Sequence, residues 1–122
     1  MKKILVADDD PNMLLLISDI LNRENYQVSQ ATTGAAALQQ VRSVMPDLVL
    51  LDVMMPGIAG VEVCRRIKGD PALRGIKVIL VTAKAQGKDI ETGLSAGADQ
   101  YITKPFRMAE LSSALHKFLD EK

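Results

Sequence analysis

The chain has 122 residues, of which 48% are apolar and 25% charged, so it has the size and composition of one globular domain covering residues 1–122. Its 15 Lys and Arg residues balance its 15 Asp and Glu residues, which excludes an overall charge attraction to nucleic acid or to anionic membranes. With no apolar run near the roughly 18 residues of a membrane helix, no cleavable leader pattern and a lone Cys64, we expect a cytoplasmic protein without a disulfide.

The first half of the chain predicts strands and helices in alternation. Short unbroken apolar runs are typical of strands buried on both faces of a sheet, and they occur at Lys3–Ala7 and at Leu48–Leu51, whereas Val28–Ala31 is expected to form a short, weaker strand. Asp10 and Thr33 can each cap the first turn of a helix through a side-chain oxygen, and Pro11 favours the same start. The two helices are expected to extend from Pro11 to Leu21 and from the Thr33 cap to Met45.

The second half of the chain repeats this pattern after a loop that contains two glycines. A helix is predicted at about Val61–Lys68, where Gly69 follows as an end signal. The remaining elements are expected as strands at Val78–Val81 and Gln100–Thr103 and as helices at Asp89–Ala96 and Met108–Leu119. Alternating strands and helices favour parallel pairing through right-handed crossovers. We therefore predict an α/β domain with a doubly wound, five-stranded parallel sheet and five flanking helices.

Polar side chains follow four of the five predicted strands. Asp8 and Asp9 follow the first strand, Asp52 the third, Thr82 the fourth and Lys104 the fifth. In a flavodoxin-like strand order of 2-1-3-4-5, ligands bind at the carboxyl ends of the first and third strands, where the three aspartates would meet. Crowded carboxylates need a neutralising cation, and an oxygen-rich site that keeps several waters suits Mg2+. The pattern predicts a magnesium site.

The chemistry that suits these groups is phosphoryl transfer to a carboxylate. An aspartate can attack phosphorus directly, and the reaction depends mostly on positioning and on neutralising the phosphoryl oxygens. Asp52 is the predicted nucleophile, with Mg2+ bridging its carboxylate and the incoming group. Lys104 would supply a positive charge, and the Thr82 hydroxyl would donate a hydrogen bond.

Four segments of the chain resemble bacterial response regulator receivers. They are residues 4–10 (ILVADDD), 48–57 (LVLLDVMMPG), 78–83 (VILVTA) and 101–106 (YITKPF). The resemblance covers nearly the whole chain and implies phosphoryl transfer to Asp52 from a sensor histidine kinase or a histidine phosphotransfer protein. It also implies that Asp9, Asp52 and the backbone carbonyl of Met54 bind Mg2+, with Asp8 acting through a metal-bound water.

The resemblance further implies a conformational switch. The hydroxyl matching Thr82 would be drawn toward the phosphoryl group, and the aromatic ring matching Tyr101 would turn inward. This would remodel the surface of the fourth helix, fifth strand and fifth helix, where a downstream effector binds. Tyr101 also has a plainer interpretation as an edge-strand aromatic. A cis peptide bond before Pro105 would direct Lys104 inward, and cis bonds are inexpensive only before proline.

Two positions depart from fast-cycling receivers, which carry Asn and Glu where this chain has Met54 and Lys84. A Met side chain cannot orient an attacking water and a lysine ammonium cannot accept its proton, so we expect slow loss of the phosphoryl group. Ala59 stands where many members have Asp, which predicts a weaker start to the third helix.

Other functions could in principle use the same residues. A Mg2+-dependent aspartyl-phosphate phosphohydrolase would need a second acid for the leaving group, and Met54 stands two places after Asp52. A flavin or nucleotide binder of the same fold would need a Gly-rich phosphate loop after the first strand. A pseudo-receiver that binds a ligand, a stand-alone or multidomain protein, and a phosphorylation-dependent dimer stay open. Direct contact with nucleic acid or membrane is not expected.

Overall fold

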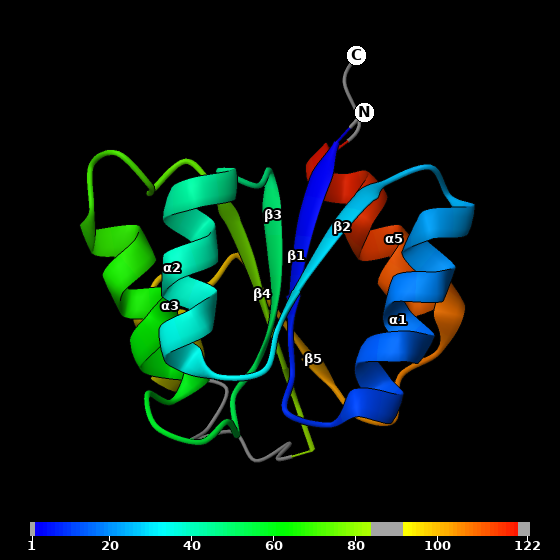
Figure 1. The fold of residues 1–122 in the computed structure, drawn as a ribbon, viewed down its shortest axis with the longest axis horizontal. Helices are drawn as coiled ribbons and strands as arrows, with labels where there is room; N and C mark the ends of the chain where they lie inside the picture. The colour runs from blue at the N-terminus through cyan, green and yellow to red at the C-terminus, as the bar shows by residue number, and fades with distance from the viewer. Residues whose placement is uncertain (1, 84–91, 120–122) are drawn as a thin grey trace.

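The computed structural model describes residues 2–83 and 92–119 and contains one five-stranded parallel sheet (Figure 1). The strand order is β2-β1-β3-β4-β5, and all four neighbouring pairs are parallel. The strands are β1 (Lys3–Ala7), β2 (Gln27–Ala31), β3 (Leu48–Asp52), β4 (Lys77–Thr82) and β5 (Gln100–Thr103). The predicted fold class and strand order are confirmed.

Helices cover both faces of this sheet. Their bounds are α1 (Pro11–Arg23), α2 (Gly34–Val44), α3 (Gly60–Gly69) and α5 (Met108–Leu119). Figure 1 shows α1 and α5 on one face and α2 and α3 on the other. The helix predicted at Asp89–Ala96 lies partly outside the described residues, and residues 92–95 are helical. Within the described ranges, no helix is both long enough and apolar enough to cross a bilayer.

The helix starts follow from their capping residues. Asp10 accepts a hydrogen bond from the Asn12 amide at 2.9 Å, and Thr33 accepts one from Ala36 at 3.1 Å. Each side chain thus satisfies an amide that has no partner within its own helix. Ala59, before α3, makes no side-chain capping bond, as its apolar side chain predicts.

Alternate residues of each strand face two separate hydrophobic layers. One layer packs the sheet against α1 and α5, with β-strand members such as Val6, Leu50 and Val81. The other packs it against α2 and α3, with members such as Leu51 and Leu80. Side chains of a strand alternate between faces, so burial of both faces requires unbroken apolar strands. Polar residues are therefore expected at the strand ends, where the functional side chains are predicted.

Cys64 lies within the second of these layers and is fully buried. Burial raises the pKa of its thiol to about 11. The thiol is therefore protonated at neutral pH, which agrees with the packing role expected for this residue.

A mostly buried ion pair joins α3 to the turn before β5. Lys68 Nζ lies 2.8 Å from Asp99 Oδ2 and also donates a hydrogen bond to the Ile76 carbonyl at 2.8 Å. Asp99 Oδ2 in turn accepts a hydrogen bond from the Val78 amide at 2.8 Å. These contacts tie the turn before β5 to β4.

Replacing this lysine tests the contribution of the pair to stability. Lys68→Met should lower the free energy of unfolding by about 1–3 kcal/mol, because Asp99 and the Ile76 carbonyl lose a charged donor. Arg23→Met is the control, since it removes an exposed pair with Asp19 and should cost less than about 1 kcal/mol. Urea unfolding monitored by circular dichroism measures both. Equal effects of the two substitutions would mean that burial adds nothing to the Lys68 pair.

Candidate functional site

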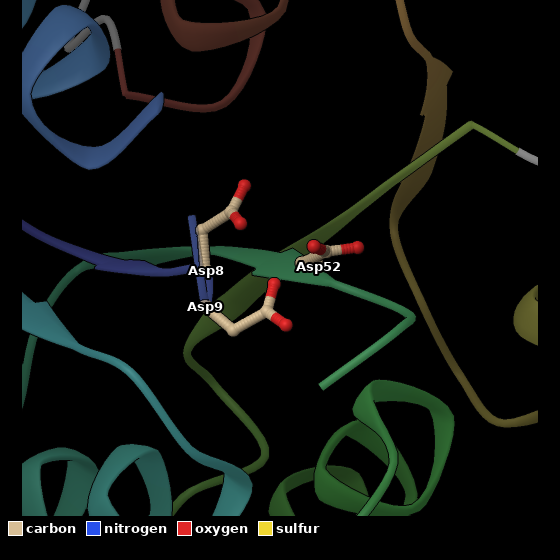
Figure 2. A group of neighbouring side chains, drawn as sticks. All are labelled: Asp8, Asp9 and Asp52. Atoms are coloured by element: carbon tan, nitrogen blue, oxygen red, sulfur yellow. The ribbon is translucent and has the colours of Figure 1, made fainter. Parts of the chain in front are cut away.

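Three carboxylates gather at the carboxyl ends of β1 and β3. The register pairs Ala7 of β1 with Leu51 of β3, so the residues that follow, Asp8 and Asp52, are neighbours. Figure 2 shows Asp8, Asp9 and Asp52 extending from these strand ends. A carboxylate oxygen from each of the three lies within 4.8 Å of the others. The structure therefore brings together the three aspartates that the strand order predicted.

The carboxylates differ in burial and in how they are held. Asp8 is 3% and Asp52 6% exposed, whereas Asp9 is exposed. Asp8 Oδ1 accepts a hydrogen bond from the Asp10 amide at 2.9 Å, and Asp52 Oδ1 accepts one from the Met54 amide at 3.0 Å. β1 and β3 are thus each followed by the same type of turn, in which an aspartate side chain accepts a hydrogen bond from the backbone amide two residues ahead. These turns were not predicted, although an aspartate at a strand end is their usual signal in a sequence.

Lys104 brings an ammonium group to the two buried carboxylates. Its Nζ lies 2.8 Å from Asp8 Oδ2 and 3.5 Å from Asp52 Oδ2. Burial by itself lowers the pKa of Lys104, but the hydrogen bond to Asp8 and the charges of both aspartates outweigh it and raise the pKa overall. The lysine therefore stays charged at neutral pH.

The surroundings of Asp52 disfavour its charged form, whereas those of Lys104 favour the charged ammonium. Its pKa is raised above the ordinary 3.8, chiefly by burial and further by the charge of Asp8. The hydrogen bond from the Met54 amide and the charge of Lys104 lower this pKa but do not cancel the rise. The ionised carboxylate is therefore held in an environment that disfavours it, and an additional cation would relieve this.

The donor set of the carboxylate cluster fits a hard divalent cation. The cluster contains three carboxylates and the single ammonium of Lys104, which leaves two negative charges uncompensated when all are ionised. All the side-chain donors are oxygens, the type that Mg2+ prefers, and the exposed Asp9 leaves room for ligands from solvent. The residues present therefore fit the predicted Mg2+.

Thr82 and Tyr101 are the two predicted switch residues. Thr82 is fully buried at the end of β4, where strand alternation places it on the α2 and α3 side with Leu80. Tyr101 of β5 pairs with Leu80 in the sheet and is partly buried on the same side. The two predicted switch residues therefore share the side of the sheet that α2 and α3 cover.

The remaining predicted site residues are Pro105, Met54 and Lys84. The peptide bond between Lys104 and Pro105 is cis, as the resemblance implied. The Met54 side chain is exposed at the surface of the loop after β3. Lys84, predicted to affect the rate of phosphate loss, lies outside the described residues.

Comparisons with known proteins agree with one another. Residues 4–116 match the family model of the response regulator receiver domain. The DNA-binding response regulator MtrA of Mycolicibacterium smegmatis is 41% identical over 110 residues, which are 90% of this chain and 47% of MtrA. This chain spans about half the length of the curated regulators it matches first.

Two solved structures are similar over nearly their full length. The BeF3-activated receiver domain of Klebsiella pneumoniae RstA is 30% identical, with a TM-score of 0.89 over 98% of this chain and all of that one. The receiver domain of the sensor histidine kinase PA1611 from Pseudomonas aeruginosa is also 30% identical, with a TM-score of 0.88 over 96% of each chain. That structure holds a magnesium ion coordinated in its active-site cleft.

The raised pKa of Asp52 predicts a pH-dependent effect on stability. Without Mg2+, Asp52→Asn should raise the free energy of unfolding at pH 7, because it removes a buried charge that the folded state disfavours. This gain should shrink as the pH falls through the raised pKa toward 3.8, where the wild-type carboxyl also becomes neutral. Urea unfolding at several pH values measures it.

The matched control is Asp19→Asn, which neutralises a carboxylate whose side chain is 55% exposed. It should show no comparable gain at pH 7. A destabilised Asp52→Asn protein at that pH would contradict the electrostatic description of the site.

Proposed function

The chain belongs to the family of response regulator receiver domains, and we propose that it accepts a phosphoryl group on Asp52. The observation that carries the choice of Asp52 is how the two buried carboxylates are held. Both oxygens of Asp8 accept short hydrogen bonds, from Lys104 at 2.8 Å and from the Asp10 amide at 2.9 Å. Asp52 Oδ2 is held more loosely, since its contact with Lys104 is 3.5 Å and weak at that length. Asp52 thus has the more available nucleophilic oxygen.

Members of this family are signalling proteins that pair with histidine kinases and effectors. The proposed donor is a sensor histidine kinase or a histidine phosphotransfer protein. Asp52 Oδ2 would form the new P–O bond while the P–N bond to the donor imidazole breaks, and the departing electron pair would stay on the imidazole nitrogen. The domain would catalyse reactions only of its own carboxylate. Later attack of water on phosphorus would release phosphate and restore the carboxylate.

The residues around Asp52 would position and neutralise the transferring group. Lys104 Nζ, already 3.5 Å from Asp52 Oδ2, would contact a phosphoryl oxygen. The site would hold Mg2+ through Asp9, Asp52 and the Met54 carbonyl, with Asp8 acting through a metal-bound water. Bound Mg2+ would neutralise charge on the carboxylates and the phosphoryl oxygens. The short hydrogen bonds that occupy both oxygens of Asp8 support this indirect role.

The output of the domain is proposed to be a change in its surface at the fourth helix, β5 and α5. Thr82 would be drawn through the sheet edge toward the phosphoryl group, and Tyr101 would turn inward. Their common face and the pairing of Tyr101 beside Leu80 support a coupled movement. A downstream effector, or a second copy after phosphorylation, would bind the altered surface. We further propose that the domain is cytoplasmic, and its zero net charge supports the proposal that it does not itself bind nucleic acid or membrane.

Incubation with acetyl phosphate tests the acceptor directly. Wild-type protein should gain one phosphoryl group when Mg2+ is present, and removal of Mg2+ by chelation should abolish most of the gain. Asp52→Asn should gain none under either condition, because the amide is not a nucleophile at phosphorus. Intact-protein mass spectrometry measures the gain. A wild-type protein that stays unmodified would overturn the proposed function.

The lifetime of the modified protein should respond to Met54 and Lys84. Met54→Asn combined with Lys84→Glu should speed the loss of phosphate by about 10-fold to 100-fold, since the pair could orient and deprotonate the attacking water. The decay of the phosphorylated mass after removal of acetyl phosphate measures this rate. Met45→Asn is the control, because Met45 is similarly exposed but follows α2 as its carboxyl-terminal cap residue. A double variant with the wild-type lifetime would contradict this role.

A further inference from the structure

Gly60, the first residue of α3, packs directly against the backbone of Asp52. A Cβ added to Gly60 would meet the Asp52 carbonyl oxygen and would lie 2.8 Å from Val53 Cα and 2.9 Å from the Asp52 carbonyl carbon. The Gly60 amide also donates a hydrogen bond to the Val53 carbonyl at 3.1 Å. The φ angle of Gly60 is not in the left-handed region. A side chain is therefore excluded by close contact and not by backbone conformation.

A second glycine packs against the other end of the loop between β3 and α3. Gly34, the first residue of α2, faces Ile58, and an added Cβ would meet the Ile58 carbonyl oxygen and lie 2.9 Å from Ile58 Cβ. The loop between β3 and α3 thus contacts a glycine at each of its ends, and each glycine is the first residue of a helix. Between these ends, Met55 is buried in the hydrophobic layer under α2 and α3.

We propose that Gly60, supported by Gly34, is a positioning residue that places the Asp52 carboxylate and the Met54 carbonyl for metal binding and phosphoryl transfer. This inference rests on the proposed function. Gly60 acts through the backbone of Asp52 and Val53, which leads directly to Met54. The carboxylate is coupled to the same backbone, since Asp52 Oδ1 accepts its hydrogen bond from the Met54 amide.

The size of the clash sets the expected effect. Carbon atoms in contact prefer separations of about 3.5–4.0 Å, whereas a Gly60 Cβ would be 2.8–2.9 Å from two backbone carbons. Backbone atoms cannot rotate away, so α3 or the Asp52 peptide must move by roughly 1 Å to regain such separations. Displacements of this size cost up to about 100-fold in rate, and disturbed support of metal ligands costs about 10-fold to 100-fold in affinity.

The test compares Gly60→Ala with Gly69→Ala in the same helix. Gly69 is the last residue of α3, and a Cβ there would meet nothing within 4 Å. Two-dimensional NMR titration with Mg2+ gives the dissociation constant and reports whether each variant is folded. Gly60→Ala should raise that constant by about 10-fold or more and slow phosphorylation by acetyl phosphate at saturating Mg2+ to a similar extent. Gly69→Ala should stay within about twofold of wild type for both.

Urea unfolding separates positioning from general stability. A Gly60→Ala protein that is less stable but binds Mg2+ and reacts as wild type does would overturn the inference while leaving the proposed function intact. If Gly60→Ala does not fold, Gly34→Ala takes its place, and a Mg2+ affinity within about twofold of wild type would overturn the inference equally. Failure of the wild-type protein to become phosphorylated would instead overturn the proposed function.

Discussion

Two carboxylates buried beside one ammonium are the electrostatic constraint that the rest of this domain has to accommodate. Asp8 and Asp52 are almost completely buried, yet Lys104 makes a short contact with Asp8 alone. Burying a charge without full compensation is costly, so this cluster needs a scaffold that is stable for other reasons. The two hydrophobic layers around a sheet buried on both faces provide that stability. Stability from the core therefore offsets the cost of keeping a carboxylate reactive.

The same imbalance explains why the site suits signalling. The raised pKa of Asp52 and the uncompensated negative charge both favour binding of a cation, which under the proposed function would prepare the site for an anionic phosphoryl group. Tyr101 and, by strand alternation, Thr82 lie on the side of the sheet that α2 and α3 cover. Leu80 of β4 and Tyr101 of β5 pair directly, and this pairing supports the proposal that a change in charge at the carboxylates alters packing on this side of the sheet.

The sequence was sufficient to predict the fold and most of the cluster because both depend on patterns local to the chain. The apolar runs of β1, β3 and β4 and the weaker signals of β2 and β5 located the five strands, and polar residues at the strand ends located the three aspartates and Lys104. Contacts between distant segments were not predictable in this way. Nothing in the spacing distinguishes Asp8 from Asp52 as the closer partner of Lys104, since that depends on side-chain reach across the folded sheet.

The role of Gly60 is another contact between distant segments that could not be predicted from the sequence. The sequence pattern places Gly60 in a loop and does not reveal its importance. That importance arises from the close approach of α3 to the Asp52 backbone and not from the neighbours of Gly60 in sequence.

The predicted helix boundaries differ from the observed ones for a similar reason. The periodic apolar pattern of α1 ends at Leu21, but the helix continues for two exposed residues to Arg23. Exposed final turns carry no apolar signal.

The central claim is that Asp52, among three adjacent carboxylates, is the one that becomes phosphorylated. Borohydride reduction of the wild-type protein after treatment with acetyl phosphate and Mg2+ converts an aspartyl phosphate into homoserine, which peptide mapping by mass spectrometry can place in the sequence. We predict homoserine at position 52, with Asp8 and Asp9 recovered unchanged. Homoserine at position 8 or 9 instead would contradict the assignment drawn from the hydrogen bonds of Asp8 and Asp52.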